Sequence, residues 1–500
     1  MADVVLIKLE SDRDDQPLAP PYGILYVASA LEKAGLSVKL FHERGTPEAV
    51  RRIGRETLEE KPLFAGFSCL TGPSLAASLD ASRLIKRNAD TAVVWGGVHP
   101  TLLPEQVLAE DGVDVAVLGE GEATVVDLAG VLKNSGPNAA ALSAVEGIAF
   151  KDANGIKRTA PRPLIPDLDA YSPAWHLLDR GRYIYGERYF YSEGGSKLPG
   201  GRVAGLITSR GCPWRCGYCL HESMHRRTFR AHSVGRVLGE IKLLKEAGVT
   251  AVNFEDANFF TDKERALEIV RAADISWGSS MRADVLARGG ERLASEISAR
   301  GCVELQVGAE SGSQRVLDLI HKDITPAQIR ESARLGRKFG IRILFSFMAG
   351  VPGETWDDIL ATLDLMDEIR SYGEMIVTNG PFLYFPFPGT SLYGRAVAGG
   401  FRPPAGTKDW TFLLWGIHQP LAPYVPRHAR FLEHYRRMAW SGGGGRPAFA
   451  AARRVLGSLA RARWRKRCFR FPLDYHLPRF LLRAAGRLGV RGCGRPRPER

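Results

Sequence analysis

The sequence lacks any long uninterrupted apolar run, and its cysteines are few and mostly scattered. No apolar run in its 500 residues approaches the ~18 that a membrane-spanning helix needs. The first eight residues also lack the basic start and apolar core of a secretory signal. Of seven cysteines, Cys69, Cys302, Cys468 and Cys493 lie far apart and suggest no disulfide framework, which is typical of a reducing compartment. We therefore expect a cytoplasmic protein.

Acidic residues are nearly missing from the carboxyl-terminal part of the chain. Residues 421–500 hold 20 Lys and Arg but only three acids, so they carry +17 of charge, and residues 1–420 carry −4 of the total +13. Within this part, 448–461 and 478–490 mix aliphatic residues and arginines at roughly helical spacing. Either two solvated helices pack on the protein, or a basic surface contacts anionic lipid peripherally. Nucleic-acid binding is disfavoured because no recognisable binding module accompanies the charge.

The first 140 residues alternate short apolar runs with helical patterns, which predicts a parallel sheet wrapped by helices. The later strands run into loops of small or polar residues, at 68–72, 96–101 and 119–122. Ligands of open α/β sheets bind at the carboxyl ends of strands, where glycine permits close approach of a large cofactor. The sequence thus predicts a doubly wound domain with a ligand crevice. Its predicted strands are 3–9, 37–41, 63–68, 92–95 and 113–118, and its predicted helices are 23–34, 73–86 and 104–110.

The alternation of strands and helices stops after residue 140 and resumes at residue 203. Between them, Asn154 and Gly155 predict a hairpin turn, and we interpret 141–200 as a linker. From residue 203 onward the pattern predicts six βα units, an incomplete barrel whose site would collect at the carboxyl ends of its strands. The predicted strands are 203–208, 251–254, 276–281, 303–307, 342–348 and 375–383.

A loop directly after the first barrel strand carries Cys212, Cys216 and Cys219 in a Cys-x3-Cys-x2-Cys spacing. Thiolates are soft ligands that select iron–sulfur clusters or zinc, and a cluster held by three of them keeps one iron open. Zinc is the alternative, with His221 or His225 as a fourth ligand, but structural zinc sites usually use two close pairs of ligands. The triad therefore favours an iron–sulfur cluster.

With Tyr218 before its last cysteine, this loop resembles the cluster-binding loop of the radical S-adenosylmethionine (SAM) enzymes, Cys-x3-Cys-x-aromatic-Cys. The resemblance implies a [4Fe-4S] cluster on the three cysteines, SAM on the open iron, and Tyr218 beside the adenine. It also implies strand-end contacts with SAM. These are Glu255 and Asp256 to the amino group, Arg282 to the carboxylate, Glu310 and Ser311 at the ribose, and Gly350 beneath the adenine.

Residues 21–28, 96–101 and 119–122 resemble the cobalamin-binding domain of B12-dependent radical SAM enzymes, a family with class B methyltransferases and anaerobic ring cyclases. No Asp-x-His-x-x-Gly sequence follows the first strand, so we expect no histidine ligand to cobalt there. The resemblance implies cobalamin contacts from Ser68, Thr71, Gly96, Gly97, His99, Thr101, Gly119, Glu120 and Gly121.

We therefore expect an α/β chain in four parts. Residues 1–140 form a Rossmann-like (flavodoxin-like) cobalamin-binding domain, 141–200 a linker, 201–395 a partial (β/α)6 TIM-like radical SAM core, and 396–500 a basic, mainly helical region.

The resemblance implies an enzyme that methylates an unactivated carbon through a 5′-deoxyadenosyl radical and methylcobalamin. One alternative is a cobalamin-dependent oxidative cyclase or other rearrangement without methyl transfer. The other is a non-catalytic ligand-sensing or membrane-associated protein with a degenerate B12 domain. The expected partners are a small-molecule or lipid-like substrate and an electron donor such as flavodoxin or ferredoxin. No motif identifies the substrate.

Overall fold

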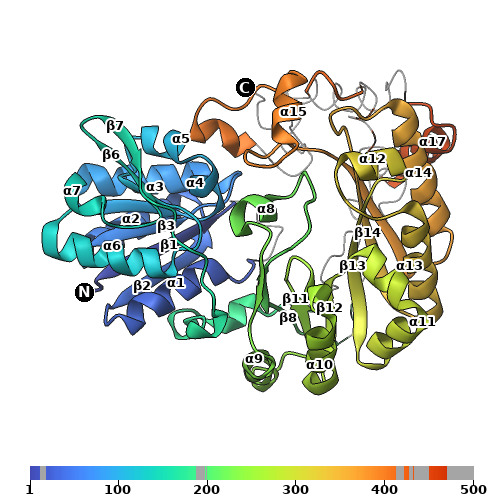
Figure 1. The fold of residues 1–500 in the computed structure, drawn as a ribbon, viewed down its shortest axis with the longest axis horizontal. Helices are drawn as coiled ribbons and strands as arrows, with labels where there is room; N and C mark the ends of the chain where they lie inside the picture. The colour runs from blue at the N-terminus through green and yellow to red at the C-terminus, as the bar shows by residue number, and fades with distance from the viewer. Residues whose placement is uncertain are drawn as a thin grey trace.

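The computed structural model describes residues 1–11, 18–186, 198, 200–412, 422–426, 429, 432 and 450–469. These residues form two α/β units that lie side by side, the amino-terminal one in blue and cyan and the second in green to yellow (Figure 1). A seven-stranded sheet forms the first unit and a six-stranded sheet the second. The α/β class that the sequence predicts is confirmed.

The amino-terminal sheet has the strand order β2-β1-β3-β4-β5-β6-β7. Its first five strands are parallel, and the order 2-1-3-4-5 is that of flavodoxin-like folds, as expected. The hairpin expected at Asn154 and Gly155 is confirmed, since β6 and β7 pair antiparallel around it. The strands are β1 (Val4–Glu10), β2 (Val38–Arg44), β3 (Phe64–Ser68), β4 (Ala92–Gly96), β5 (Val115–Val117), β6 (Ile148–Asp152) and β7 (Gly155–Arg158).

Helices cover both faces of this sheet, so it has two cores. Along β1, Leu6 faces one core with Leu25 and Leu128, whereas Ile7 faces the other core with Ile53. Successive side chains of a strand point to opposite faces, which is why one apolar run supplies both cores. The helices are α1 (Tyr22–Lys33), α2 (Pro47–Glu60), α3 (Ser74–Asn88), α4 (Val98–Leu102), α5 (Pro104–Ala109), α6 (Glu122–Ser135) and α7 (Ala139–Leu142).

The segment that follows β7 and leads into the second unit contacts both units. Its three short 3-10 helices are η1 (Leu168–Ala170), η2 (Trp175–Leu177) and η3 (Arg180–Tyr183). The indole of Trp175 packs edge-on against Tyr22 of α1 and donates to Glu240 of the second unit at 3.3 Å. Asp169 in turn bonds the ring of His232 at 2.8 Å. The segment therefore fixes one unit against the other.

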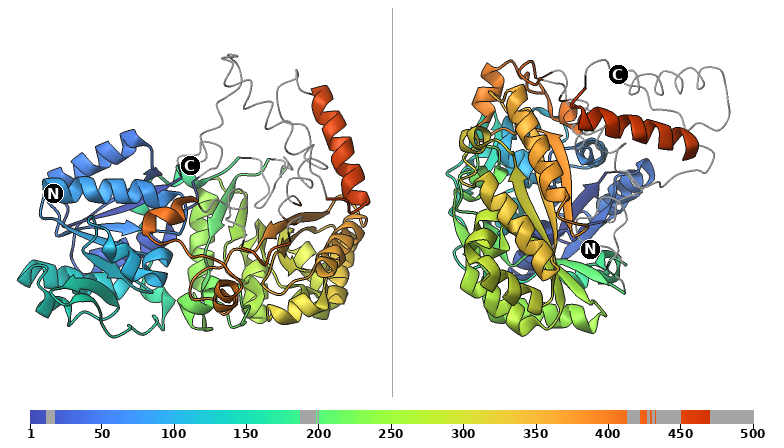
Figure 2. Two further views of the ribbon diagram at one scale, coloured as in Figure 1. Left: turned by 90° about the horizontal axis from the view of Figure 1, so that it is seen from above. Right: turned by 90° about the vertical axis from the view of Figure 1, so that its right-hand side faces the viewer.

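The second unit is a parallel sheet whose six strands follow one another in chain order, with helices outside it (Figures 1 and 2). This confirms the predicted partial barrel. Its strands are β8 (Val203–Leu206), β11 (Ala251–Phe254), β12 (Ser276–Ser280), β13 (Cys302–Glu310), β14 (Arg342–Ala349) and β15 (Ile376–Leu383). Its helices are α9 (Val234–Glu246), α10 (Lys263–Ala273), α11 (Ala283–Ala299), α12 (Gln314–Leu319), α13 (Pro326–Phe339) and α14 (Trp356–Arg370).

The chain after the barrel returns to the amino-terminal unit. Beyond α15 (Tyr393–Ala398), the 3-10 helix η5 (Thr407–Phe412) places Trp410 in the core beside α3. The fully buried Trp410 indole donates to the Gln106 side chain at 2.7 Å, and Gln106 donates to the carbonyl of Pro404 at 3.0 Å. This segment therefore ties the two units together a second time.

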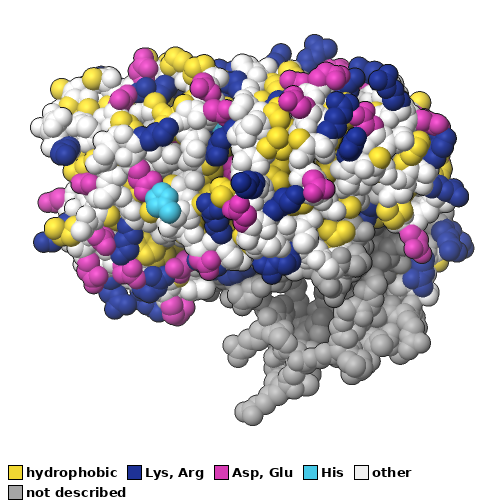
Figure 3. Space-filling model, turned by 90° about the horizontal axis from the view of Figure 1, so that it is seen from below, with side chains coloured by type: hydrophobic (Ala, Val, Ile, Leu, Met, Phe, Trp, Pro, Cys, Tyr) yellow, Lys and Arg dark blue, Asp and Glu magenta, His cyan; other side chains and the backbone are white. Residues whose placement is uncertain are grey.

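The predicted helix at 448–461 corresponds to α17 (Ala450–Arg465), whose Trp464 donates to Asp367 of α14. The predicted helix at 478–490 lies outside the described residues. In the part of the chain that the structure describes, no helix is both long and apolar enough to span a bilayer. On the face drawn in Figure 3, cationic and anionic side chains are interspersed over the described residues, as the near-neutral charge of residues 1–420 leads one to expect.

Candidate functional site

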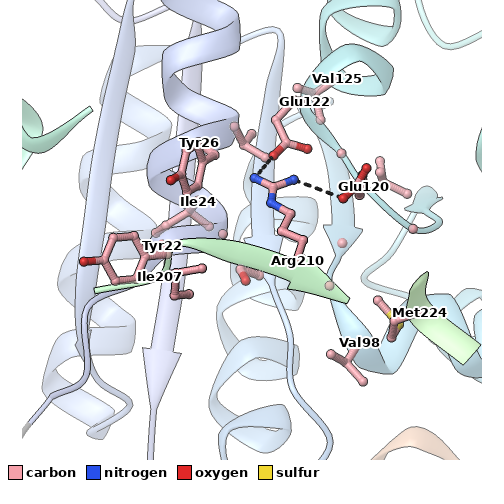
Figure 4. Close-up of a pocket in the computed structure, with 18 of the residues that line it drawn as sticks. Tyr22, Ile24, Tyr26, Val98, Glu120, Glu122, Val125, Ile207, Arg210 and Met224 are labelled. Carbon is pink, nitrogen blue, oxygen red and sulfur yellow. Dashed lines mark hydrogen bonds and ion pairs between the residues drawn. The ribbon is translucent and has the colours of Figure 1, made fainter. Parts of the chain in front are cut away.

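A cavity of about 420 Å³ lies where the strands of the amino-terminal sheet end, and the barrel closes its other side. Six of the residues predicted from the amino-terminal loops line it: Ser68, Gly96, Gly97, Gly119, Glu120 and Gly121. From the barrel come residues of the segment around β9 (Ser209–Gly211) and of α8 (Leu220–His225), including Arg210 and Met224 (Figure 4). The volume is within the usual range of ligand pockets.

Glycines make the wall of this cavity on the amino-terminal side. Gly97 has φ +100° and ψ −165°, a conformation open essentially only to glycine, and a Cβ there would lie 2.9 Å from the carbonyl oxygen of Cys69. Gly119 has φ +78° and open space where its side chain would be. Bare backbone can approach a large planar ligand closely, so the chemistry of this wall is compatible with cobalamin.

Thr71, His99 and Thr101 stand behind this wall rather than on it. The fully buried His99 is hydrogen-bonded through Nδ1 to the Thr71 hydroxyl at 3.1 Å and packs edge-on against Trp410. Burial lowers the pKa of His99 to about 4, so its ring is neutral. The Thr101 hydroxyl donates to the carbonyl of Gly97 and accepts from the amide of Gly119, which fixes the two glycine loops together.

Arg210 joins the two sides of the cavity. Its guanidinium bonds Glu122 at 2.6 Å and Glu120 at 3.2 Å, and it lies 4.8 Å from the centre of the Tyr26 ring (Figure 4). Arg230 bonds Glu120 from the other side at 2.8 Å. Although burial opposes ionisation of Glu120, these cations and the amide of Ile165 lower its pKa. The cavity rim is therefore an ionic contact between the two units.

The predicted acidic pair at the end of β11 is divided between two environments. Asp256 is buried and accepts from the amides of Thr208 and Ser209 at 2.7 and 2.8 Å, and from the Thr208 hydroxyl at 2.5 Å. It thus supports the strand that leads into the cysteine loop. Glu255 lines the cavity instead, and desolvation by the surrounding protein raises its pKa to about 7. Gly205 makes room for it, since a Cβ there would meet the Glu255 carboxylate at 2.2 Å.

The cysteine loop contacts the segments that follow α12 and β15 of the barrel. The amide of Gly217 donates to the carbonyl of Ile320 at 2.8 Å, and Leu392 donates back to Gly217 at 2.9 Å. Burial, reinforced by the neighbouring Cys216, raises the pKa of both Cys212 and Cys219, to about 11 for Cys219. Three neighbouring free thiols on one loop fit a cluster, whose thiolates bind separate irons. Among the described residues no three His, Cys, Asp or Glu side chains converge on a single metal ion.

Beside this loop the structure brings together Tyr218, Glu310 and Lys322. The Tyr218 hydroxyl donates to Glu310 at 2.7 Å, and the Lys322 ammonium donates to both, at 2.9 Å to Tyr218 and 3.1 Å to Glu310. Burial alone would lower the pKa of Lys322, but attraction to Glu310 and Cys216 outweighs burial and raises it, so the lysine is charged.

Arg282 lies next to Tyr218, Glu310 and Lys322, but its guanidinium already has partners within the protein. Its guanidinium donates to Asp284 at 2.8 Å and to the carbonyls of Lys322 and Asp323 at 2.8 and 3.2 Å, and it packs 4.6 Å from the centre of the Trp214 ring. It therefore holds the loop that carries Lys322.

The last two predicted contacts also have partners inside the barrel. The buried Ser311 hydroxyl is hydrogen-bonded to the Thr362 hydroxyl at 2.9 Å. Gly350, at φ +80°, donates its amide to the buried carboxylate of Glu354. Burial raises the pKa of Glu354 to about 7. Both residues shape the barrel edge through these bonds.

Sequence reasoning missed three residues of this arrangement: Lys322, Arg210 and Glu122. A single lysine after a short helix has the same pattern as a surface lysine, so no signal identified Lys322. Arg210 stands two residues before Cys212, and Glu122 belongs to the loop already selected as a resemblance. Their positions beside known motifs were the available signal for that pair.

Comparison with known proteins gives two family matches. The B12 binding domain matches residues 16–129, and the radical SAM superfamily matches residues 206–366. An uncharacterized methyltransferase of Pyrococcus horikoshii is 30% identical over 388 residues, which cover 76% of this chain and 79% of that protein.

Two further similar proteins differ from each other in activity. The anaerobic magnesium-protoporphyrin IX monomethyl ester cyclase of Cereibacter sphaeroides is 29% identical over 75% of this chain, which spans 60% of the length of that cyclase. The radical SAM methyltransferase TsrM of Kitasatospora setae, solved with cobalamin and a [4Fe-4S] cluster, matches with a TM-score of 0.61 and 18% identity over 82% of this chain and 81% of TsrM. At that identity the structural match supports the fold.

Proposed function

The chain belongs to the family of B12-binding radical SAM enzymes, and from this premise we propose that it is a cobalamin-dependent C-methyltransferase. The observation that carries the proposal is the shared cavity, since a glycine wall and the strand that leads into the cysteine loop face each other across it. A methyl carrier and a radical source that act on one substrate carbon need such proximity.

We propose that residues 1–140 hold cobalamin and that residues 201–395 hold the cluster and SAM, with 396–500 as the basic region. Residues 141–200 would be the linker, although its first part adds β6 and β7 to the edge of the amino-terminal sheet. Gly97, Gly119 and the neighbouring predicted residues would accept the cofactor against bare backbone, with Thr71, His99 and Thr101 as supports. Cys212, Cys216 and Cys219 would bind the cluster. When bound, the cluster supplies the electron that cleaves SAM, and cobalamin carries the methyl group.

The remaining side chains would orient the reactants around the cysteine loop. Tyr218 and Glu310 share a hydrogen bond and would meet SAM as a fixed pair, and Arg282 would act through the Lys322 loop that it holds. Glu255 faces the cavity with a raised pKa, so it can hold or release a proton near neutral pH. Because Asp256 is satisfied by backbone amides, we propose that it positions the loop.

Cyclisation without methyl transfer is the second candidate, favoured by the 29% identity to the cyclase. Both candidates use a radical and cobalamin, so the site does not separate them. The family membership favours either enzyme over the non-catalytic alternative. A small-molecule substrate and a reductant are shared by radical SAM enzymes. A lipid-like substrate, a flavodoxin or ferredoxin donor, and peripheral membrane contact by residues 421–500 are further proposals.

The test is the set of products made from SAM labelled with deuterium in its methyl group, using anaerobically reconstituted protein with cobalamin and dithionite. A methyltransferase gives 5′-deoxyadenosine and also S-adenosylhomocysteine, with at least one molecule of S-adenosylhomocysteine for each bound cobalamin. A cyclase gives 5′-deoxyadenosine alone. If neither product forms, both candidates are contradicted.

A further inference from the structure

The Lys322 ammonium is a buried cation at the cysteine loop, and Glu310 is its one carboxylate partner among the described residues. Lys322 is 7% exposed and Glu310 is 9% exposed. The ammonium also bonds the hydroxyl of Tyr218, which stands between Cys216 and Cys219 in the sequence. A charge in such a place acts through protein rather than water, so its effect on neighbouring charge is weakly screened.

The surrounding backbone is shaped to keep this pair in place. Glu310 has φ +63° and His321 has φ +52°, conformations that residues other than glycine seldom adopt. Gly308 is required beneath the pair, since a Cβ there would lie 2.4 Å from the Glu310 carboxylate and 2.9 Å from the Lys322 ammonium. Strained backbone that persists at a site points to a function for the group that it presents.

Three further contacts fix the lysine loop to the cysteine loop. Arg282 bonds the carbonyl of Lys322 at 2.8 Å while its guanidinium lies over Trp214 of the cysteine loop. The carbonyl of Ile320 accepts the amide of Gly217 at 2.8 Å. The ammonium therefore has a fixed position relative to the three thiols, as a tuning charge requires.

A cluster on three thiolates gains one negative charge when it accepts an electron. A fixed cation nearby stabilises that added charge and raises the reduction potential, whereas a fixed anion lowers it; net charge and hydrogen bonding are known determinants of cluster potential. Arg282 is another buried cation beside these loops, but its guanidinium donates to Asp284 and to the carbonyls of Lys322 and Asp323. The Lys322 ammonium instead donates to the hydroxyl of Tyr218, so the Lys322–Glu310 pair is the charged pair that is hydrogen-bonded to a side chain of the cysteine loop.

We propose that Lys322 is a positioning residue that sets the reduction potential of the cluster, with Glu310 opposing it and Tyr218 linking the two. This inference rests on the proposed function, because it requires the cluster to be present. One electron passes from an external reductant to the oxidised cluster, and the lysine charge makes the reduced form easier to reach.

The experiment is an anaerobic redox titration of the reconstituted full chain without SAM, with the reduced cluster followed by electron paramagnetic resonance. At a fixed poise, Lys322→Met should lower the ratio of reduced to oxidised cluster about tenfold, a shift of about 59 mV to more negative potential for a one-electron couple. Lys322→Arg keeps the charge and should stay within about threefold of wild type. Glu310→Gln should shift the potential in the opposite direction.

Lys338→Met is the matched control, because Lys338 lies on α13 in a half-exposed pair with Glu291. It should leave the potential unchanged. If Lys322→Met loses its iron, the sign of the Glu310→Gln shift decides the matter. The inference would be overturned, and the proposed function left standing, by either of two results. One is variants with full iron content and the wild-type potential, and the other is a negative shift in Glu310→Gln. A wild-type chain that binds no cluster would overturn the proposed function and this inference with it.

Discussion

The two sheets end in different ways at the site. The amino-terminal sheet ends in glycines whose backbone lies bare along the cavity, and its polar side chains, such as Thr101, stand behind that wall. The barrel sheet ends in charged and hydroxyl side chains that already satisfy one another, as Glu310 does with Lys322 and Ser311 with Thr362.

This difference matches two kinds of binding. A large planar cofactor gains most from a wall without side chains, because area and backbone contact dominate its binding. A small charged reactant next to a cluster gains most from groups that need no reorganisation when it arrives. Single substitutions can therefore disrupt one side of the site at a time.

Loss of one cysteine should remove the cluster from the barrel side of the site and leave the amino-terminal side intact. Cys216→Ala should lower bound iron from about four per chain to near zero and abolish SAM cleavage, because two thiolates hold a cluster poorly. Cobalamin binding should stay within about twofold of wild type. Iron analysis and absorption spectra measure both. Cys468→Ala, at an exposed thiol, is the control that keeps its iron.

Breaking the ionic contact between the edges should destabilise the whole chain. Arg210→Met leaves Glu122, whose side chain is 4% exposed, without its cation, and breaking such a pair costs about 3–5 kcal/mol. Urea unfolding measures the change. Arg271→Met removes a more exposed pair with Glu296 and should cost about 1 kcal/mol or less. Equal losses in the two variants would contradict the role of Arg210.

A side chain on the glycine wall should selectively harm the amino-terminal edge. Gly97→Val places a Cβ against the backbone of Cys69 in a glycine-only conformation, at a cost of about 1–3 kcal/mol, and should weaken cobalamin binding about tenfold or more while the cluster remains. Gly136 has φ +65° and ψ −175° at the end of α6, away from the cavity. Gly136→Val should therefore lose stability but bind cobalamin normally, and similar binding by the two variants would refute the wall.

Glu354 and Glu255, whose pKa values are both raised to about 7, should differ in how they affect stability. Glu354 is 6% exposed with a pKa of about 7, so its folded form retains a proton that the unfolded chain releases above about pH 4.5. Its contribution to the free energy of unfolding therefore falls as pH rises from 5 to 8. Glu354→Gln should make that fall in stability smaller by about 2 kcal/mol. Glu255 faces the cavity and is more exposed than Glu354, so its raised pKa should weigh less on stability and Glu255→Gln should change the slope less. Chemical unfolding at several pH values tests both, and a larger effect of Glu255 would reverse the comparison.

Local pattern was enough to predict most of the framework. Short apolar runs gave the strands of both sheets, and the glycine loops and cysteine spacing gave the positions of the two edges. Several helices were missed, and α2 and α6 are the longest of them: α2 begins with a Thr46 cap and Pro47, and α6 begins at Glu122, which was interpreted as loop. Capping signals, rather than apolar periodicity, would have identified α2.

The internal partners of the site residues were beyond prediction. Asp256 bonds amides 47 and 48 residues away, and Trp410 reaches Gln106 across 304 residues, so both depend on how distant elements pack. The same holds for Lys322, which meets Tyr218 across 104 residues. Sequence spacing shows which residues stand at strand ends, but it does not show which of them are already satisfied.

The most direct test of the account is the iron, sulfide and cobalamin content of the wild-type chain, reconstituted anaerobically with hydroxocobalamin and freed of unbound cofactor. We expect about four irons and one cobalamin per chain. A chain that retains the iron but no cobalamin would contradict the glycine edge as a cofactor wall, and with it the proposal of methyl transfer.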